Sequence, residues 1–133
     1  MRFEENNMKL REAIRALKMQ RDVRVEDDLL YMWINELEGR AQTEIMLADV
    51  LDVIRYSEEQ YDANLLILPP HDHLYVDWLL YKTAEYYGEY DRAQYLSAEF
   101  EKKYKSFAAW YMNEYRPAVR RRLEREQCRT TMV

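Results

Sequence analysis

The sequence has few of the residues that interrupt regular structure or cross-link it. Its 133 residues include two glycines, three prolines and one cysteine, against average usages of roughly 7% glycine and 5% proline. So few turn-forming residues argue against a sandwich or barrel of many short strands, and long helices remain. The single cysteine, Cys128, can form neither an internal disulfide nor a cysteine metal cluster.

Long apolar runs are also missing. No segment approaches the roughly 18 apolar residues of a membrane span, and residues 1–7 lack the apolar centre of a signal peptide. We therefore expect a protein that stays inside the cell that makes it and has no membrane partner. With 48% hydrophobic residues, the chain can bury one core and form one compact domain.

Hydrophobic periodicity predicts an all-α fold, a small bundle of about four helices. The helices are expected at about residues 7–19, 26–45, 71–87 and 91–115. The third leaves little of its surface polar, so it should be the central helix. The second should carry a solvated face with Asn35, Glu36, Glu38, Arg40 and Gln42.

Four residues carry expectations about local geometry. Asp72 and Asp91 are expected to cap the third and fourth helices by accepting from backbone N–H groups. Gly88 should supply a left-handed residue between those helices. Gly39, inside the second helix, costs about 1 kcal/mol relative to alanine, so a close contact with another helix is expected there.

Residues 49–70 form a long connection between the second and third helices. The connection contains the apolar run Leu65, Leu66, Ile67 and Leu68, which Pro69 and Pro70 should hold in extended geometry. Connections of this length are uncommon inside compact domains and are often functional. The connection and its apolar run are therefore a candidate protein interface.

Proline and arginine mark the end of the predicted domain. Pro117 should weaken the fourth helix near Tyr115, which gives a single helical domain at 1–117 and a basic tail or helix extension at 118–133. Residues 1–115 carry 14 basic and 23 acidic side chains, a net charge of −9, whereas residues 116–133 carry +4. The candidate docking residues of the tail are Arg116, Arg120, Arg121, Arg122 and Arg125.

Three interpretations of these arginines stay open. They could be a solvated helix end, where cations interact favourably with the helix dipole. They could dock on an acidic protein partner, or they could bind the phosphates of a nucleic acid. The acidic body would repel DNA, which favours a protein partner and leaves only a transient contact with DNA.

Tyrosine is the most over-represented residue type, with 12 copies. Tyrosine joins a flat apolar ring to a polar hydroxyl and is enriched at protein interfaces. The candidate interface residues beside the apolar run are therefore Tyr75, Trp78, Tyr86 and Tyr90. This surplus indicates association between copies, a homo-oligomer.

The sequence contains no strong catalytic motif. His71, His73 and Asp77 could hold a metal ion only if the backbone were extended there, and polar residues at a helix start explain them more simply. The segment from Gly88 to Ala93 is similar to the helix-hairpin turn of a tetratricopeptide repeat, but no second copy follows at the required period. We expect no enzyme, no cofactor and no small-molecule substrate.

The order of the segments resembles a family of phage proteins. The segments are Asp27 to Arg40, Leu68-Pro69-Pro70, Leu74 to Leu79, Gly88-Glu89-Tyr90 and Phe107 to Tyr111. Together they are similar to the small head–tail connector, or adaptor, proteins of tailed phages and prophages of Gram-positive bacteria. The resemblance covers about residues 8–117.

The resemblance implies a non-enzymatic virion assembly protein. Such a protein forms a helical ring that docks on the portal protein and on a downstream neck or tail protein. It would be assembled in the bacterial host cytoplasm and would end in the virion neck. On this chain, Asp49 to Pro70 would be a reaching loop and Arg116 to Val133 a docking tail. The alternative is a small helical nucleic-acid-binding or regulatory protein that uses the arginine-rich tail.

Overall fold

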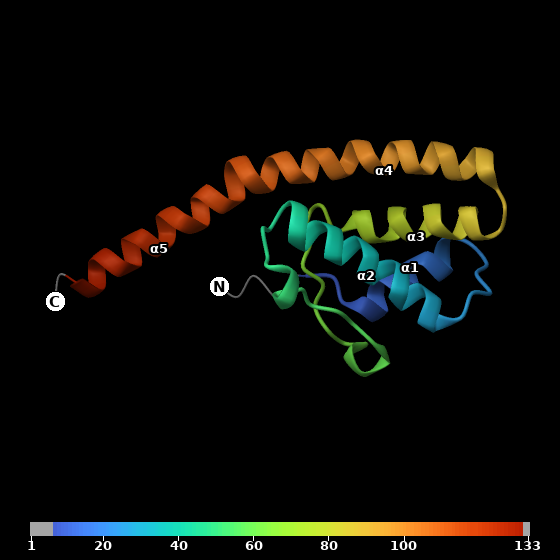
Figure 1. Ribbon diagram of the computed structural model, residues 1–133, viewed down its shortest axis with the longest axis horizontal. Coiled ribbons are helices and arrows are strands. Elements are labelled where there is room, and N and C mark those ends of the chain that lie inside the picture. The colour runs from blue at the N-terminus through green and yellow to red at the C-terminus, as the bar shows by residue number, and fades with distance from the viewer. Residues whose placement is uncertain (1–6, 132–133) are drawn as a thin grey trace.

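The computed structural model describes residues 7–131 and confirms the small all-α bundle, with 72% of the chain helical (Figure 1). The described residues contain no strand, and their one isolated bridge pairs Lys9 with Asn64 in antiparallel fashion. The α-helices are α1 (Leu10–Gln20), α2 (Asp27–Glu44), α3 (His73–Tyr86), α4 (Tyr90–Trp110) and α5 (Arg116–Thr131). Two short 3₁₀ helices, η2 (Val50–Asp52) and η3 (Glu58–Gln60), lie in the connection, and a π-helical segment, η4 (Tyr111–Tyr115), joins α4 to α5.

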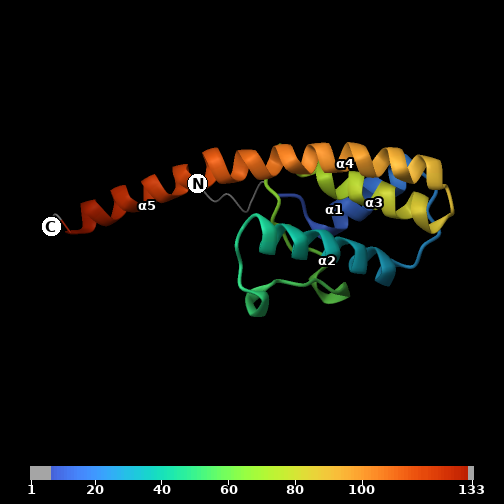
Figure 2. The same cartoon turned by 45° about the horizontal axis from the view of Figure 1, so that its top comes forward.

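The central position predicted for the third helix is confirmed. Helix α3 packs against α4 on one side and against α1 and α2 on the other (Figures 1 and 2). The core that these helices share is apolar and aromatic, and its largest completely buried side chains include Tyr75, Phe100, Phe107, Leu10 and Ile34. Gly88 has φ of +75° between α3 and α4, the left-handed geometry expected of it.

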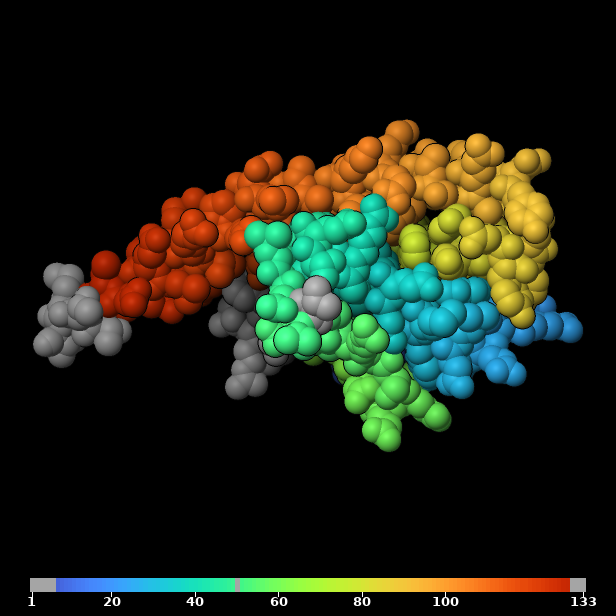
Figure 3. Space-filling view, in the orientation of Figure 1, coloured from blue at the N-terminus to red at the C-terminus, as the bar shows by residue number. Residues whose placement is uncertain are grey.

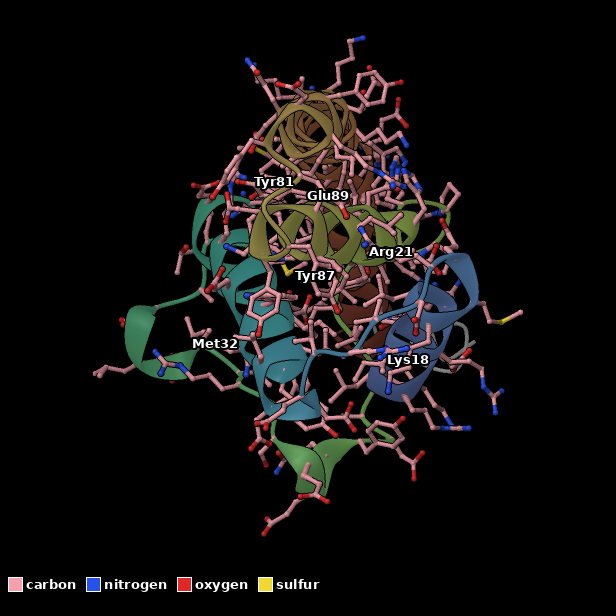
Figure 4. All side chains as sticks on the ribbon, turned by 90° about the vertical axis from the view of Figure 1, so that its right-hand side faces the viewer. Lys18, Arg21, Met32, Tyr81, Tyr87 and Glu89 are labelled. Carbon is pink, nitrogen blue, oxygen red and sulfur yellow. The ribbon has the colours of Figure 1, made fainter. Side chains whose placement is uncertain are left out.

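The two predicted aspartate caps are wrong. Asp72 does occupy the N-cap position of α3, but its side chain makes no capping hydrogen bond. Helix α4 begins one residue before Asp91, and its N-cap residue is Glu89. The Glu89 carboxylate accepts two hydrogen bonds from the Arg21 guanidinium, at 3.0 and 3.1 Å, and Figure 4 shows the two side chains facing each other. This pair joins the end of α1 to the turn between α3 and α4.

The α-helical pattern of the fourth helix ends at Trp110 and gives way to π turns up to Tyr115, an interruption expected near Pro117, but the chain stays helical and continues into α5. The Arg116 N–H donates to the Tyr111 carbonyl, five residues earlier, and this wider π turn lies directly before Pro117. Proline has no N–H to donate, and a local change of helical pitch accommodates it without a break. As a result α5 continues from α4 and extends beyond the bundle (Figures 1 and 2).

Gly39 makes no close helix contact, contrary to the prediction. A Cβ atom built on Gly39 meets no atom within 4 Å. The residue lies in the middle of α2 and is half-buried. The cost of a glycine within this helix is therefore not offset by closer packing inside the chain.

Replacing Gly39 by alanine should stabilise the protein. The free energy of unfolding is expected to rise by about 1 kcal/mol, because alanine has the higher helix propensity and the site has room for its methyl group. Urea unfolding followed by circular dichroism measures the change. Gly88→Ala is the matched control and should lower stability by about 1 kcal/mol, since its φ is positive. A loss of stability in Gly39→Ala would contradict the prediction.

Candidate functional site

Glu38 is completely buried in α2, although the sequence places it on a solvated face. Its carboxylate accepts hydrogen bonds from the Tyr75 hydroxyl, from the Tyr56 hydroxyl at 3.0 Å and from the Leu66 N–H at 3.0 Å. The Tyr75 hydroxyl in turn accepts from the Ile67 N–H at 2.7 Å. The connection and α3 are thereby joined to α2 through one buried acid.

Two amide side chains of α2 bind the backbone of the connection in the same way. Asn35 donates to the Tyr56 carbonyl at 2.8 Å and accepts from the Tyr56 N–H at 2.7 Å. Gln42, which is buried, donates to the Ile54 carbonyl at 3.0 Å and accepts from the Ile54 N–H at 2.8 Å. Each side-chain amide thus bonds both the N–H and the C=O of one residue of the connection, as a residue of a neighbouring antiparallel strand would. The predicted solvated face of α2 is wrong at Glu38 and Gln42.

The other side of the connection pairs with the chain before and within α1. The Leu65 N–H donates to the Met8 carbonyl at 2.8 Å, and the Leu10 N–H donates to the Ala63 carbonyl at 3.0 Å. The Asn7 amide adds a bond to the Leu65 carbonyl at 2.8 Å. Residues 54–56 and 63–67 are therefore held against the rest of the bundle, whereas residues 57–62 are exposed and form the part of the connection that projects outward (Figure 1).

Burial raises the pKa of Glu38, because the charged carboxylate loses its hydration. The hydrogen bonds from Tyr75, Leu66 and Tyr56 act in the opposite direction but do not cancel the effect of burial. Burial and the neighbouring Glu38 carboxylate also raise the pKa of Tyr75 and of Tyr56. Both hydroxyl donors to Glu38 therefore keep their hydrogens at neutral pH.

This raised pKa predicts a pH dependence of stability that Glu38→Gln should remove. The native state holds the Glu38 proton more tightly than the unfolded chain does, so this residue stabilises most below about pH 4.5. Its contribution should fall as the pH rises from there through the raised pKa, and then level off. Urea unfolding of both proteins over a pH series measures the difference.

Comparison of the two proteins separates the effect of Glu38 from that of carboxylates whose pKa is lowered by folding. Hydrogen bonds from Arg21 and Arg40 lower the pKa of Glu89 and of Glu101 respectively, and their stabilisation is lost as the pH falls. Both residues are present in wild type and variant, so their effects cancel in the difference. Parallel stability curves for the two proteins would contradict the raised pKa of Glu38.

Three predicted interface residues belong to the core instead. Leu65, Ile67 and Tyr75 are completely buried within one chain, so their side chains present no surface to a partner. The apolar run is covered because Leu65 and Ile67 point inward beside the hydrogen bonds that fix their backbone. For these three residues the interface prediction is wrong.

The other predicted interface residues remain at least partly accessible. Leu66, Leu68 and Trp78 are half-buried, and the Trp78 indole donates to the Trp33 carbonyl at 2.8 Å. Tyr86 and Tyr90 lie at the end of the α3–α4 hairpin and are 57% and 73% exposed. These two tyrosines are therefore accessible to a partner, as are Tyr61, Tyr87 and Tyr95.

The histidines predicted as possible metal ligands lie in an aromatic cluster. The His71 ring lies 4.9 Å from Trp110 and 5.4 Å from Phe107, measured between centroids. His73 hydrogen-bonds through Nδ1 to the Pro70 carbonyl at 3.0 Å, and the Asp77 carboxylate accepts from Lys103 at 3.1 Å. Between residues 7 and 131, no three histidine, cysteine or acidic side chains are placed to hold a metal ion.

The tail arginines are ordered on a helix, and four of them share one side of it. Arg121, Arg122, Arg125 and Arg129 fall within about 100° of one another around α5, at 100° a residue, and we call them the arginine face. Ala118 lies among them, and residues 121–129 are all exposed. Arg120 lies on another side of α5, and Arg116 is half-buried in its first turn.

A groove of about 500 Å³ lies between α2 and the connection. We call it the acidic groove, because Asp28, Glu36 and Glu58 line it against one cation, Arg55. Met32 adds an exposed apolar side chain on the α2 side (Figure 4). Figure 3 shows this face, with α2 and the green connection side by side. The groove was not predicted from the sequence. Its only signal there is that Asn35, Glu38 and Gln42 lie on one face of α2, and this pattern is also what a solvated helix face shows.

Comparisons with known proteins assign this chain to no family. No protein-family model, curated protein or solved structure matches it. Among residues 7–131, no helix combines the length and the apolar character needed to cross a membrane.

Proposed function

We propose that the protein is a non-enzymatic virion assembly protein, a head–tail connector that forms a ring and docks on a portal protein. The order of its segments from Asp27 to Tyr111 resembles that family. In this proposal the ring joins the portal to a downstream neck or tail protein. It is assembled in the bacterial host cytoplasm and remains in the virion neck.

The observation that carries the proposal is the continuous helix from α4 through η4 into α5. It supports a docking role because it carries a cationic surface beyond the bundle on one continuous helix (Figure 1). The exposed Tyr86 and Tyr90 add a second surface, at the opposite end of α4. Two separated surfaces suit a subunit that contacts more than one neighbour. Because hydrogen bonds hold much of the connection against α2, α5 is the better candidate for the element that contacts a neighbouring subunit.

Co-migration tests this function. The full chain is mixed with the portal complex of the same phage or prophage and separated by size. We expect the chain to co-migrate with the portal complex and a variant ending at residue 117 to bind more weakly. A full chain that elutes apart from the portal complex at all concentrations would refute the connector function.

The arginine face also supports the alternative, a small helical protein that binds nucleic acid. Four cations on one helix face can neutralise phosphates, and affinity should then fall steeply as salt rises. Deletion of residues 116–133 should abolish that binding. Binding to a DNA duplex that ignores salt, or no binding at all, would rule this alternative out.

A further inference from the structure

We infer that α5 of one copy docks by its arginine face in the acidic groove of a second copy. The inference rests on the proposed function, because a ring requires contacts between copies, and it names the surfaces that make them. The occupant of the groove is thus a basic helix of this same chain.

Charge complementarity is the first argument. The arginine face presents four guanidinium groups, one of which, that of Arg122, lies 4.0 Å from Glu126. The acidic groove presents three carboxylates against one cation, and one of them, that of Glu36, also lies 3.5 Å from Lys82. Guanidinium groups form paired hydrogen bonds with carboxylates. The methylene stems of the arginines can also cover exposed apolar atoms such as those of Met32.

The dimensions of the two surfaces also agree. Helix α5 has 16 residues and is about 24 Å long at the usual rise per residue. The α2 wall of the groove, from Asp28 to Gly39, is about 17 Å long by the same measure. A few turns of α5 therefore span the length of the groove, and the arginine side chains rather than the whole helix would enter it.

A chain cannot fill its own groove. Helix α5 continues from α4 with a bend and extends beyond the bundle (Figures 1 and 2), and folding it back onto the groove would require a break at η4. The contact must therefore be made with another copy. Because the two surfaces differ, each copy offers one helix and one groove, a head-to-tail arrangement that closes into a ring or extends into a filament.

The exposure of α5 supports the presence of a partner. Helix α5 continues α4 through η4, so within one chain it is supported at one end only. Its residues 121–129 are exposed within one chain. Docking in a groove would supply the packing that a single copy does not give this helix.

A charge exchange tests the contact. One variant carries Glu36→Lys and Glu58→Lys in the groove, and the other carries Arg121→Glu, Arg125→Glu and Arg129→Glu on α5. Each alone should associate at least about tenfold more weakly than wild type, because like charges then face each other. Mixing the two variants should restore association, and sedimentation velocity over a concentration series measures it. Failure of the mixture to associate, with both variants folded by circular dichroism, overturns the proposal.

Cross-linking gives a second measurement that needs little change to the fold. The wild-type chain has one cysteine, Cys128, which is exposed on α5 beside Arg121 and Arg125. It is mixed with a Met32→Cys, Cys128→Ser variant and treated with a short bismaleimide. Links between the two kinds of chain should exceed those formed with the control Met19→Cys, Cys128→Ser, whose new cysteine lies on α1 outside the groove. Equal yields overturn the proposal.

The outcomes separate this inference from the connector function. If the cross-links form and the charge exchange restores association, but the chain does not co-migrate with the portal complex, the contact between copies stands and the connector function is refuted. If the chain co-migrates with the portal complex but shows neither cross-links nor restored association, the connector function stands and the contact between copies is refuted. Binding of a DNA duplex by the arginine face, with no association between copies, would overturn the proposed contact.

Discussion

Replacing Glu38 by alanine is expected to lower the free energy of unfolding by about 3–5 kcal/mol, because buried hydrogen-bond donors lose their acceptor. The variant leaves the Leu66 N–H and the hydroxyls of Tyr56 and Tyr75 buried without their acceptor. Each buried donor left unpaired costs about 1–3 kcal/mol. Because domains are stable by only about 5–15 kcal/mol, most of the stability could be lost.

Urea unfolding at neutral pH measures this loss. The control is Glu36→Ala, two residues earlier on α2, where the side chain is 43% exposed and lies 3.5 Å from Lys82. An exposed ion pair contributes at most about 1 kcal/mol, so the control should remain close to wild type. Equal losses in the two variants would show that Glu38 has no special role.

Replacing Tyr75 by phenylalanine is expected to lower the free energy of unfolding by about 2–4 kcal/mol. The ring stays and its packing is kept, so the change isolates the hydroxyl. That hydroxyl donates to Glu38 and accepts from the Ile67 N–H. Its removal leaves a buried backbone donor unpaired and takes one hydrogen bond from a buried charge.

The matched control is Tyr95→Phe on α4, where the ring is 66% exposed. It should change stability by less than about 0.5 kcal/mol, as surface substitutions usually do. Hydrogen exchange offers a second measurement, since the Ile67 amide should lose protection in Tyr75→Phe. An Ile67 amide that exchanges as slowly as in wild type would contradict the assigned bond.

The buried network also affects the proposed contact between copies. The connection forms one wall of the acidic groove, and Glu38 and Asn35 hold that wall against α2. Loss of the Glu38 network should therefore loosen the groove as well as the fold. Glu38 itself contacts no second copy, but it positions the wall of the acidic groove that is proposed to bind one.

Helix positions could be predicted from the sequence where one local pattern decides them. The apolar spacing in α1 and α2, the enclosed surface of α3 and the left-handed Gly88 all follow from neighbours along the chain. The caps could not be predicted in this way. Glu89 occupies the N-cap of α4 while its carboxylate pairs with Arg21, 68 residues earlier in the sequence.

The candidate site was less predictable than the helices. Polar residues on a helix usually face water, but Glu38 and Gln42 are buried because the connection covers them. The sequence likewise shows that arginines are clustered in the tail. It does not show that a π turn carries the helix past Pro117 and holds those arginines beyond the bundle.

By itself the sequence determined an all-α chain with one core, an acidic body and a basic end. These properties depend on composition and on periods of a few residues, which short-range sterics and hydrophobic burial convert into helices. Only the tertiary structure decided that much of the connection is held against α2, that Leu65, Ile67 and Tyr75 are core residues, and that a groove forms beside α2. Those outcomes depend on hydrogen bonds between residues far apart in the chain, whose donors and acceptors must be paired once they are buried.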